Sequence, residues 1–210
     1  MELGFTTAVY VVAAVLFILS LGGLSGQESA KRAVWYGIVG MGLAVFATLI
    51  GPGTGFWWLS IILIAGGGWI GYQLASKVEM TQMPELVAGM HALVGLAAIF
   101  VGFNAHFELG NVVAMDEAAK KTLHGFAALL AKKSEAEINI LRVEVSLGIW
   151  IGAVTFTGSV IAYGKLAGKV TSAATKLPGG HLLNAGAAII SVLCLFWYLN
   201  SGELLPLMGL

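Results

Sequence analysis

The sequence predicts an all-α protein, a polytopic bundle of transmembrane helices. Charged residues make up 10% of the 210 positions, whereas a soluble domain carries roughly 25%. The mean hydropathy is +0.90. The apolar residues also gather in long runs, and a helix needs about 20 such residues to cross a hydrocarbon core about 30 Å thick. These three observations predict a chain embedded in a lipid bilayer, with no soluble half.

Six stretches meet or nearly meet this length: 4–24, 33–50, 56–75, 84–104, 145–164 and 182–199. A seventh begins at "ELLPLMGL" and stops after one turn, so we expect the chain to be a piece of a longer membrane subunit. We treat residues 1–210 as one transmembrane domain. Its first apolar run lacks a preceding basic region and is longer than the 7–15 residues of a signal peptide, which predicts a retained span.

The connections predict antiparallel neighbours and an orientation. Most are short and rich in turn-forming residues, such as "GPGTG". Alternate short loops carry basic residues, and the two opposite ones carry none, so the basic side is cytoplasmic by the positive-inside rule and the N-terminus lies outside. The basic residues counted are Lys31, Arg32, Lys77, Lys165, Lys169 and Lys176.

Only the connection 105–142 is long. Its part "MDEAAKKTLHGFAALLAKKSEAEINILR" has apolar residues at helical spacing among charged ones. This pattern predicts one or two amphipathic helices at the membrane surface, either as a solvated cap or as an element that docks a partner.

Several classes of function are excluded or lack support. The formal net charge is zero, which argues against nucleic acid as a partner because phosphates require concentrated Lys and Arg. The single cysteine, Cys194, excludes an intrachain disulfide and is typical of a small apolar filler. "GGGWIG" at 66–71 matches a dinucleotide pattern, but it lies inside an apolar stretch instead of after a strand, so we expect its glycines to allow close helix packing.

No metal site is expected. Three of the four histidines lie in or beside predicted loops, without cysteine, aspartate or histidine at ligand spacing. They are His106, His124 and His181.

His91 is the exception, because it lies inside the apolar stretch "PELVAGMHALVGLAA". Counted from Pro84, it is about 10 Å into the helix. Small residues recur around it in steps of three or four, which marks a face where membrane helices approach closely. We therefore expect the imidazole to face the bundle. The small residues are Ala88, Gly95, Ala98 and Gly102.

Two interpretations of His91 remain open. Imidazole is the side chain that gains or loses charge most easily near neutral pH, and a low dielectric disfavours its charged form. A ring that takes a proton only when water or a carboxylate arrives has the properties of a proton relay. Alternatively, a neutral ring donates a hydrogen bond to a neighbouring helix and contributes only to packing.

The fifth stretch carries small and hydroxyl-bearing residues on one face, namely Glu144, Gly148, Gly152, Thr155, Ser159 and Ala162. Packed against the His91 face, it would leave a narrow seam able to hold ordered water. Hydroxyls of Ser and Thr can instead bond to carbonyls of their own helix, and for Thr155 and Thr157 we favour this alternative.

Three further polar residues are candidates for the same path. Glu85 follows Pro84 in a first helical turn, where a carboxylate offsets the exposed N–H groups. Glu144 is either a residue of the channel mouth or part of a solvated helix end. Asn104 closes the fourth stretch as a C-terminal cap.

Two blocks, "KVEMTQMPELVAGMHALVGLAAIFVGFN" and "GIWIGAVTFTGSVIAYGKLAGKV", closely resemble the membrane domain of the beta subunit of proton-translocating NAD(P) transhydrogenase. The resemblance extends over essentially all 210 residues. It implies hydride transfer from NADH to NADP, coupled to proton movement across the bacterial cytoplasmic (inner) membrane. It also implies that His91 belongs to the proton path and that Ser159 lies close to it.

The resemblance further implies where the cofactors are bound. NAD is held by a separate alpha subunit, and NADP by a soluble domain that follows the membrane helices, in a dimer of multi-subunit protomers. The later helices, one with a channel asparagine, and the NADP domain are missing from this sequence, so we expect it to bind neither cofactor. The rival interpretation is a non-catalytic membrane scaffold or small transporter with a packing histidine.

Overall fold

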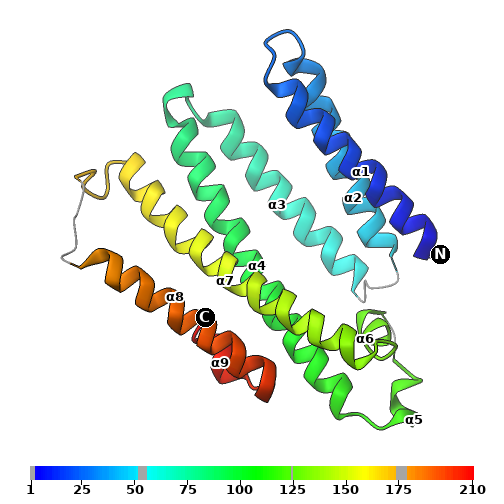
Figure 1. Ribbon diagram of the computed structural model, residues 1–210. Coiled ribbons are helices and arrows are strands. Elements are labelled where there is room, and N and C mark those ends of the chain that lie inside the picture. The colour runs from blue at the N-terminus through cyan, green and yellow to red at the C-terminus, as the bar shows by residue number, and fades with distance from the viewer. Residues whose placement is uncertain (1–2, 52–55, 124, 174–178) are drawn as a thin grey trace. The chain divides into compact units, whose positions relative to one another are not determined.

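A computed structural model of the chain describes residues 3–51, 56–123, 125–173 and 179–210 (Figure 1). Within these ranges the secondary structure is helical and contains no strand, which confirms the all-α prediction. Six of the described helices are long and apolar enough to cross a membrane. Most of the "GPGTG" loop, together with His124 and Lys176, lies outside the described residues.

The helices follow the chain in this order: α1 (Leu3–Leu24), α2 (Ala30–Ile50), α3 (Trp57–Lys77), the 3₁₀ turn η1 (Met80–Gln82), α4 (Met83–Ala114), α5 (Glu117–Lys120), α6 (Gly125–Leu130), α7 (Glu135–Leu166), α8 (Gly180–Ser201) and α9 (Leu204–Met208). The short helix α9 occupies the segment in which a seventh span was expected to begin. Its continuation as a span stays a prediction.

Helices α4 and α7 are each 32 residues long and extend well beyond the apolar stretches that predicted them. The prediction of one loop over 105–142 is therefore wrong at both ends. The physical reason at the α7 end is a capping box, in which the Ser134 hydroxyl accepts from the Glu137 backbone N–H while the Glu137 carboxylate accepts from the Ser134 N–H at 2.8 Å. Between α4 and α7, the described residues of the expected amphipathic segment form the short helices α5 and α6.

The chain forms two compact units. The first contains the antiparallel pair α1 and α2. Small residues bring these helices together, since a Cβ atom on Gly40 would lie 3.2 Å from the Ala13 carbonyl oxygen. The Tyr10 hydroxyl and the Thr48 hydroxyl also share a hydrogen bond at 2.9 Å. This pair is the hairpin that the short first connection predicts.

The second unit contains α4, α7, α8 and α9. Helices α4 and α7 run side by side along much of their length, and α8 lies beside α7 (Figure 1). A small apolar core joins α4, α7, α8 and α9 near one end of the pair. Its buried residues are Ala105, Val145, Ile149, Tyr198 and Leu207.

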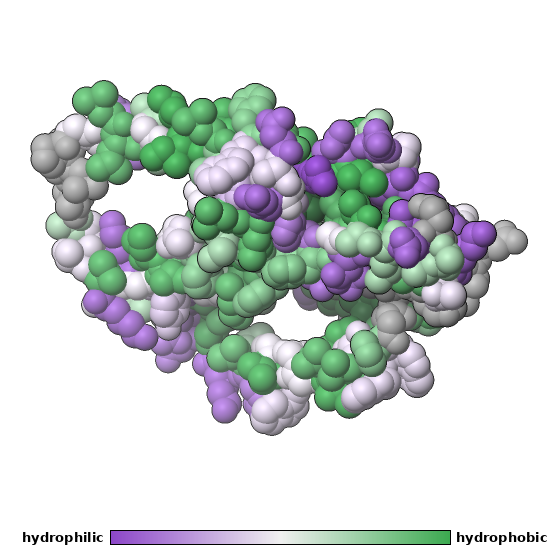
Figure 2. Space-filling model, turned by 90° about the horizontal axis from the view of Figure 1, so that it is seen from below, coloured by the Kyte–Doolittle hydropathy of each residue, from purple (hydrophilic) through white to green (hydrophobic). Residues whose placement is uncertain are grey.

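Large apolar side chains lie mainly on the outside of the helices. Ile18, Leu63 and Trp69, for example, are each about two-thirds exposed. Green apolar residues accordingly make up much of the surface in Figure 2, beside purple polar ones. Such an outward face is stable only in an apolar solvent, because burying apolar area away from water is the main favourable term in folding. The structure thus fits helices surrounded by lipid.

Candidate functional site

The closest approach between α4 and α7 lies at two facing glycines. A Cβ atom built on Gly95 would lie 2.6 Å from the Phe156 backbone nitrogen and 2.8 Å from the Gly152 carbonyl oxygen. A Cβ atom on Gly152 would lie 2.8 Å from the Gly95 carbonyl oxygen. Since these neighbours are backbone atoms, the backbones of the two helices touch at Gly95 and Gly152.

Further contacts fix the register of this pair. Gly89 faces the Tyr163 ring, 3.6 Å from where a Cβ atom would be, and Gly102 is covered by the Ile149 side chain. The residue numbers of the contacts fall along α7 as they rise along α4, so the two helices are antiparallel. The predicted packing of the two small-residue faces is confirmed at Gly95, Gly102 and Gly152, whereas Gly148 has open space around it.

This register brings His91 and Ser159 to the same level of the pair. His91 lies on α4 between Gly89 and Gly95, and Ser159 lies on α7 between the residues that contact those glycines. Ser159 is half-buried. The sequence-predicted neighbours therefore share one level of the α4–α7 pair.

The imidazole of His91 lies at the edge of this crossing. Its side chain is exposed and forms no hydrogen bond to another described residue, while Ala92 beside it is 6% exposed. The expectation that the imidazole faces the packed helices is therefore not met within the described residues, because Ala92 and not His91 takes the buried position here. The role of His91 as a relay stays a prediction.

The other predicted path residues have separate positions. Glu85 lies in the first turn of α4, one residue after Pro84, as expected for a carboxylate that offsets a helix N-terminus. The Thr157 hydroxyl donates to the Ala153 carbonyl oxygen at 2.8 Å, which confirms the expected bond within its own helix.

Two expectations about helix ends are wrong. Asn104 is not a C-terminal cap, because α4 continues ten residues further, to Ala114. Glu144 does not lie in a terminal turn, because α7 begins at Glu135. Both side chains are exposed. The error has one source, since polar residues beyond the apolar stretches extend the helices and do not end them.

Sequence reasoning missed a polar cluster around His106. This histidine lies in α4, and its Nδ1 shares a hydrogen bond of 3.0 Å with the hydroxyl of Tyr198 on α8. Tyr198 is completely buried. Beside them a cavity of about 220 Å³ is also lined by Arg142 of α7. One signal was present in the sequence, because His106 follows Gly102 by four residues and so continues the face that packs on α7.

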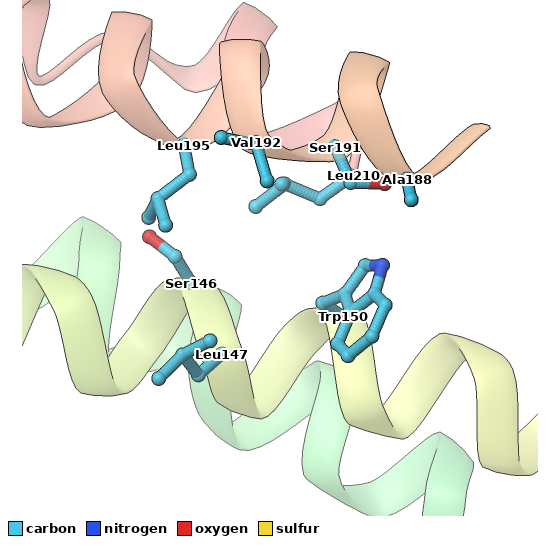
Figure 3. Close-up of a pocket in the computed structure, with 8 residues that line it drawn as sticks. All are labelled: Ser146, Leu147, Trp150, Ala188, Ser191, Val192, Leu195 and Leu210. Atoms are coloured by element: carbon cyan, nitrogen blue, oxygen red, sulfur yellow. The ribbon is translucent and has the colours of Figure 1, made fainter. Parts of the chain in front are cut away.

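A second cavity, of about 190 Å³, lies between α7 and α8 (Figure 3). Ser146 and Trp150 project from α7 toward α8, and Leu147 of α7 also lines the cavity. The Ser146 hydroxyl donates to the Arg142 carbonyl oxygen at 2.7 Å. The remaining lining is mostly apolar: Ala188, Ser191, Val192, Leu195 and Leu210. No charged group lines this cavity within the described part of the chain.

The structure also locates the glycine motif and tests the described residues for metal ligands. "GGGWIG" lies in the middle of α3, and Cβ atoms on its glycines would meet no other atom within 4 Å. The close packing expected there is therefore not seen among the described residues. No three His, Cys, Asp or Glu side chains of the described ranges come near enough to hold one metal ion.

Known proteins match this chain over most of its length. The family model for the NAD(P) transhydrogenase beta subunit matches residues 6–210. Two similar relatives from Rhodospirillum rubrum, both named NAD(P) transhydrogenase subunit beta, are 41% identical over 176 residues. The match covers 84% of this chain and 34% of each relative, so the chain spans about a third of their length.

The match and the six membrane-capable helices agree in describing a multi-pass membrane protein. On this evidence the chain belongs to the family of NAD(P) transhydrogenase beta subunits.

Proposed function

We propose that this chain is part of the proton-translocating membrane domain of an NAD(P) transhydrogenase. In this proposal, proton movement across the membrane is coupled to hydride transfer from NADH to NADP. Family membership supports the reaction class. The observation that carries the proton path is the common level of His91 and Ser159 beside the Gly95–Gly152 contact.

His91 acts in this proposal as the protonation switch. An imidazole changes charge near neutral pH, and the exposed His91 side chain lies next to the buried Ala92 on α4. Ser159 on the facing helix supplies a hydroxyl at the same level, able to orient a water molecule. Glu85 lies about 9 Å nearer the start of α4 and is a candidate donor toward that end.

Coupling would operate through helix packing. A charge on His91 changes which partner the ring requires, and two arrangements of a tightly packed helix pair can differ by only a few kcal/mol. The Gly95–Gly152 contact transmits such a change well, because backbone in contact with backbone has no flexible side chain to absorb it. The two packings would then alter how the nucleotide-binding parts sit on the membrane surface.

The hydride chemistry is assigned to partners. We propose that NAD is held by an alpha subunit and NADP by a soluble domain of the beta subunit, within a dimer of protomers. The relatives extend well beyond the matched third of their length, which leaves room for such a domain. The basic loops at Lys31 and Lys77 would lie on the cytoplasmic side of a bacterial inner membrane, with the N-terminus outside.

The test is replacement of His91 in the complete complex in sealed vesicles. For His91→Ala we expect proton-coupled turnover to fall by roughly a hundredfold, the lower range for removing an acid–base group. Binding of NAD and NADP should change less than about twofold. The matched control is His181→Ala, which removes an exposed histidine at the start of α8 and should leave turnover unchanged.

The rival function is a scaffold or small transporter in which His91 only packs. It predicts that His91→Ala and His91→Gln lower stability equally and leave coupling intact. Wild-type coupling in a folded His91→Ala complex would remove His91 from the mechanism.

A further inference from the structure

Arg142 is a half-buried cation that lines a cavity of the second unit. It is one of two arginines in the sequence and projects from α7 into the cavity that His106 and Tyr198 also line. Its guanidinium lies against Gly202, 3.1 Å from where a Cβ atom would be. Gly202 has φ = 66°, a conformation that glycine adopts without strain, and a larger residue at this position would bring its Cβ atom close to the guanidinium.

The positive charge of Arg142 has no counterion in the described part of the chain. No described carboxylate forms an ion pair with its guanidinium, although the side chain is half-buried. Removing an arginine from water without a partner is unfavourable. The guanidinium therefore provides N–H donors that an anion would satisfy.

Two neighbouring groups add uncharged donors. When the Tyr198 hydroxyl donates to Nδ1 of His106, Nε2 of that ring carries the proton and has no described partner. The Ser201 hydroxyl lines the same cavity and accepts from the Glu203 backbone N–H at 3.1 Å, so its own proton is available to donate. The polar groups that line the cavity are thus one permanent cation and neutral hydrogen-bonding side chains, and no carboxylate is among its lining residues.

The depth of the cavity places it at the lipid headgroups. His106 follows Pro84 by 22 residues, which is about 33 Å along a helix, and the hydrocarbon core is about 30 Å thick. Trp197, beside Tyr198 in sequence, is 49% exposed, as expected for the aromatic belt at a membrane surface. The cavity therefore opens at the face opposite the start of α4.

We propose that the Arg142 cavity binds the phosphodiester of a phospholipid headgroup. A guanidinium presents two parallel N–H donors that match phosphate oxygens and form stronger hydrogen bonds than neutral donors do. The volume of about 220 Å³ accommodates the phosphate, and Leu109 and Val113 give the apolar wall that the glycerol backbone would contact. This assignment stands independently of the proton path through His91.

The experiment compares two lipids that differ only in the headgroup. The complete complex, purified in detergent, is titrated with dioleoylphosphatidylglycerol or with dioleoylglycerol, and retained lipid is counted by native mass spectrometry. Wild type should retain the phosphatidylglycerol, and Arg142→Gln should bind it roughly tenfold more weakly, since hydrogen bonds to charged groups contribute about 1.5–3 kcal/mol. Arg32→Gln, which removes the other arginine, should match wild type.

Three outcomes overturn the proposal. They are equal retention of phosphatidylglycerol by wild type and Arg142→Gln, equal retention of both lipids by wild type, and displacement of the lipid by millimolar inorganic phosphate. The last result would assign the site to the free anion. If Arg142→Gln does not fold, Ser201→Ala decides, because it changes an exposed side chain: weaker retention supports the proposal and unchanged retention overturns it.

Discussion

Helices α4 and α7 meet in two different ways at two levels. At Gly95 and Gly152 the contact is backbone against backbone. Further along, His106 of α4 and Arg142 of α7 line a cavity to which α8 contributes Tyr198. The first region is fixed by the absence of side chains, and the second by polar side chains that need partners.

The glycine contact and the cavity therefore respond to different changes. A contact without side chains tolerates almost no added volume, so it responds sharply to any change in helix position. A cavity lined by a cation and hydroxyls tolerates changes in volume but responds to charge. A proton switch belongs beside the first kind of region, and a bound anion belongs in the second.

The largest expected effect comes from filling the glycine contact. Gly152→Ala should lower the free energy of unfolding by about 1–3 kcal/mol, because its Cβ atom has to displace backbone atoms of α4. Gly148→Ala, one turn away with open space around it, should be neutral or more stable by about 0.5–1 kcal/mol. Denaturant unfolding in detergent measures both, and equal effects would show that the contact is not rigid.

An intermediate effect is expected in the polar region. Tyr198→Phe removes the bond to His106 from a completely buried side chain and should lower the free energy of unfolding by about 1 kcal/mol. Tyr10→Phe breaks an exposed hydroxyl bond to Thr48 and should have a smaller effect. If the two variants unfold alike in the same titration, the polar region contributes no more than an ordinary surface bond.

The smallest effect is expected where a hydroxyl bonds only to its own helix. Thr157→Val should change the free energy of unfolding by less than about 0.5 kcal/mol, because Thr157 is exposed and its hydroxyl already bonds to Ala153. Proton-coupled turnover should also stay at the wild-type level. A large loss of turnover would move Thr157 into the proton path and weaken the case for Ser159.

The sequence predicted the helices and the glycine contact because both depend on local patterns. Runs of about 20 apolar residues indicate spans, and small residues in steps of three or four indicate the packed face. Gly95 and Gly152 were found in this way. No side-chain chemistry has to be known for such a prediction.

The cluster of His106, Tyr198 and Arg142 could not be predicted from the sequence for two physical reasons. A polar residue such as Asn104 at the end of an apolar stretch predicts the end of a helix, although α4 continues to Ala114 and includes His106. The partners are also distant in sequence, since His106 and Tyr198 are 92 residues apart. Nothing local to either residue indicates that pairing, which depends on where α8 lies beside α7.

The central claim is that His91 reaches water while it lies within the membrane, and side-specific labelling tests it most directly. His91→Cys and the control Leu93→Cys, at an exposed apolar position of the same helix, both with Cys194→Ser, are treated with a membrane-impermeant thiol reagent from each face of vesicles holding the complete complex. Both positions are exposed on α4. Labelling of position 91 from at least one face, with position 93 unlabelled, is the predicted result. If position 91 stays as inert as position 93 from both faces, no water path reaches it and the account is contradicted.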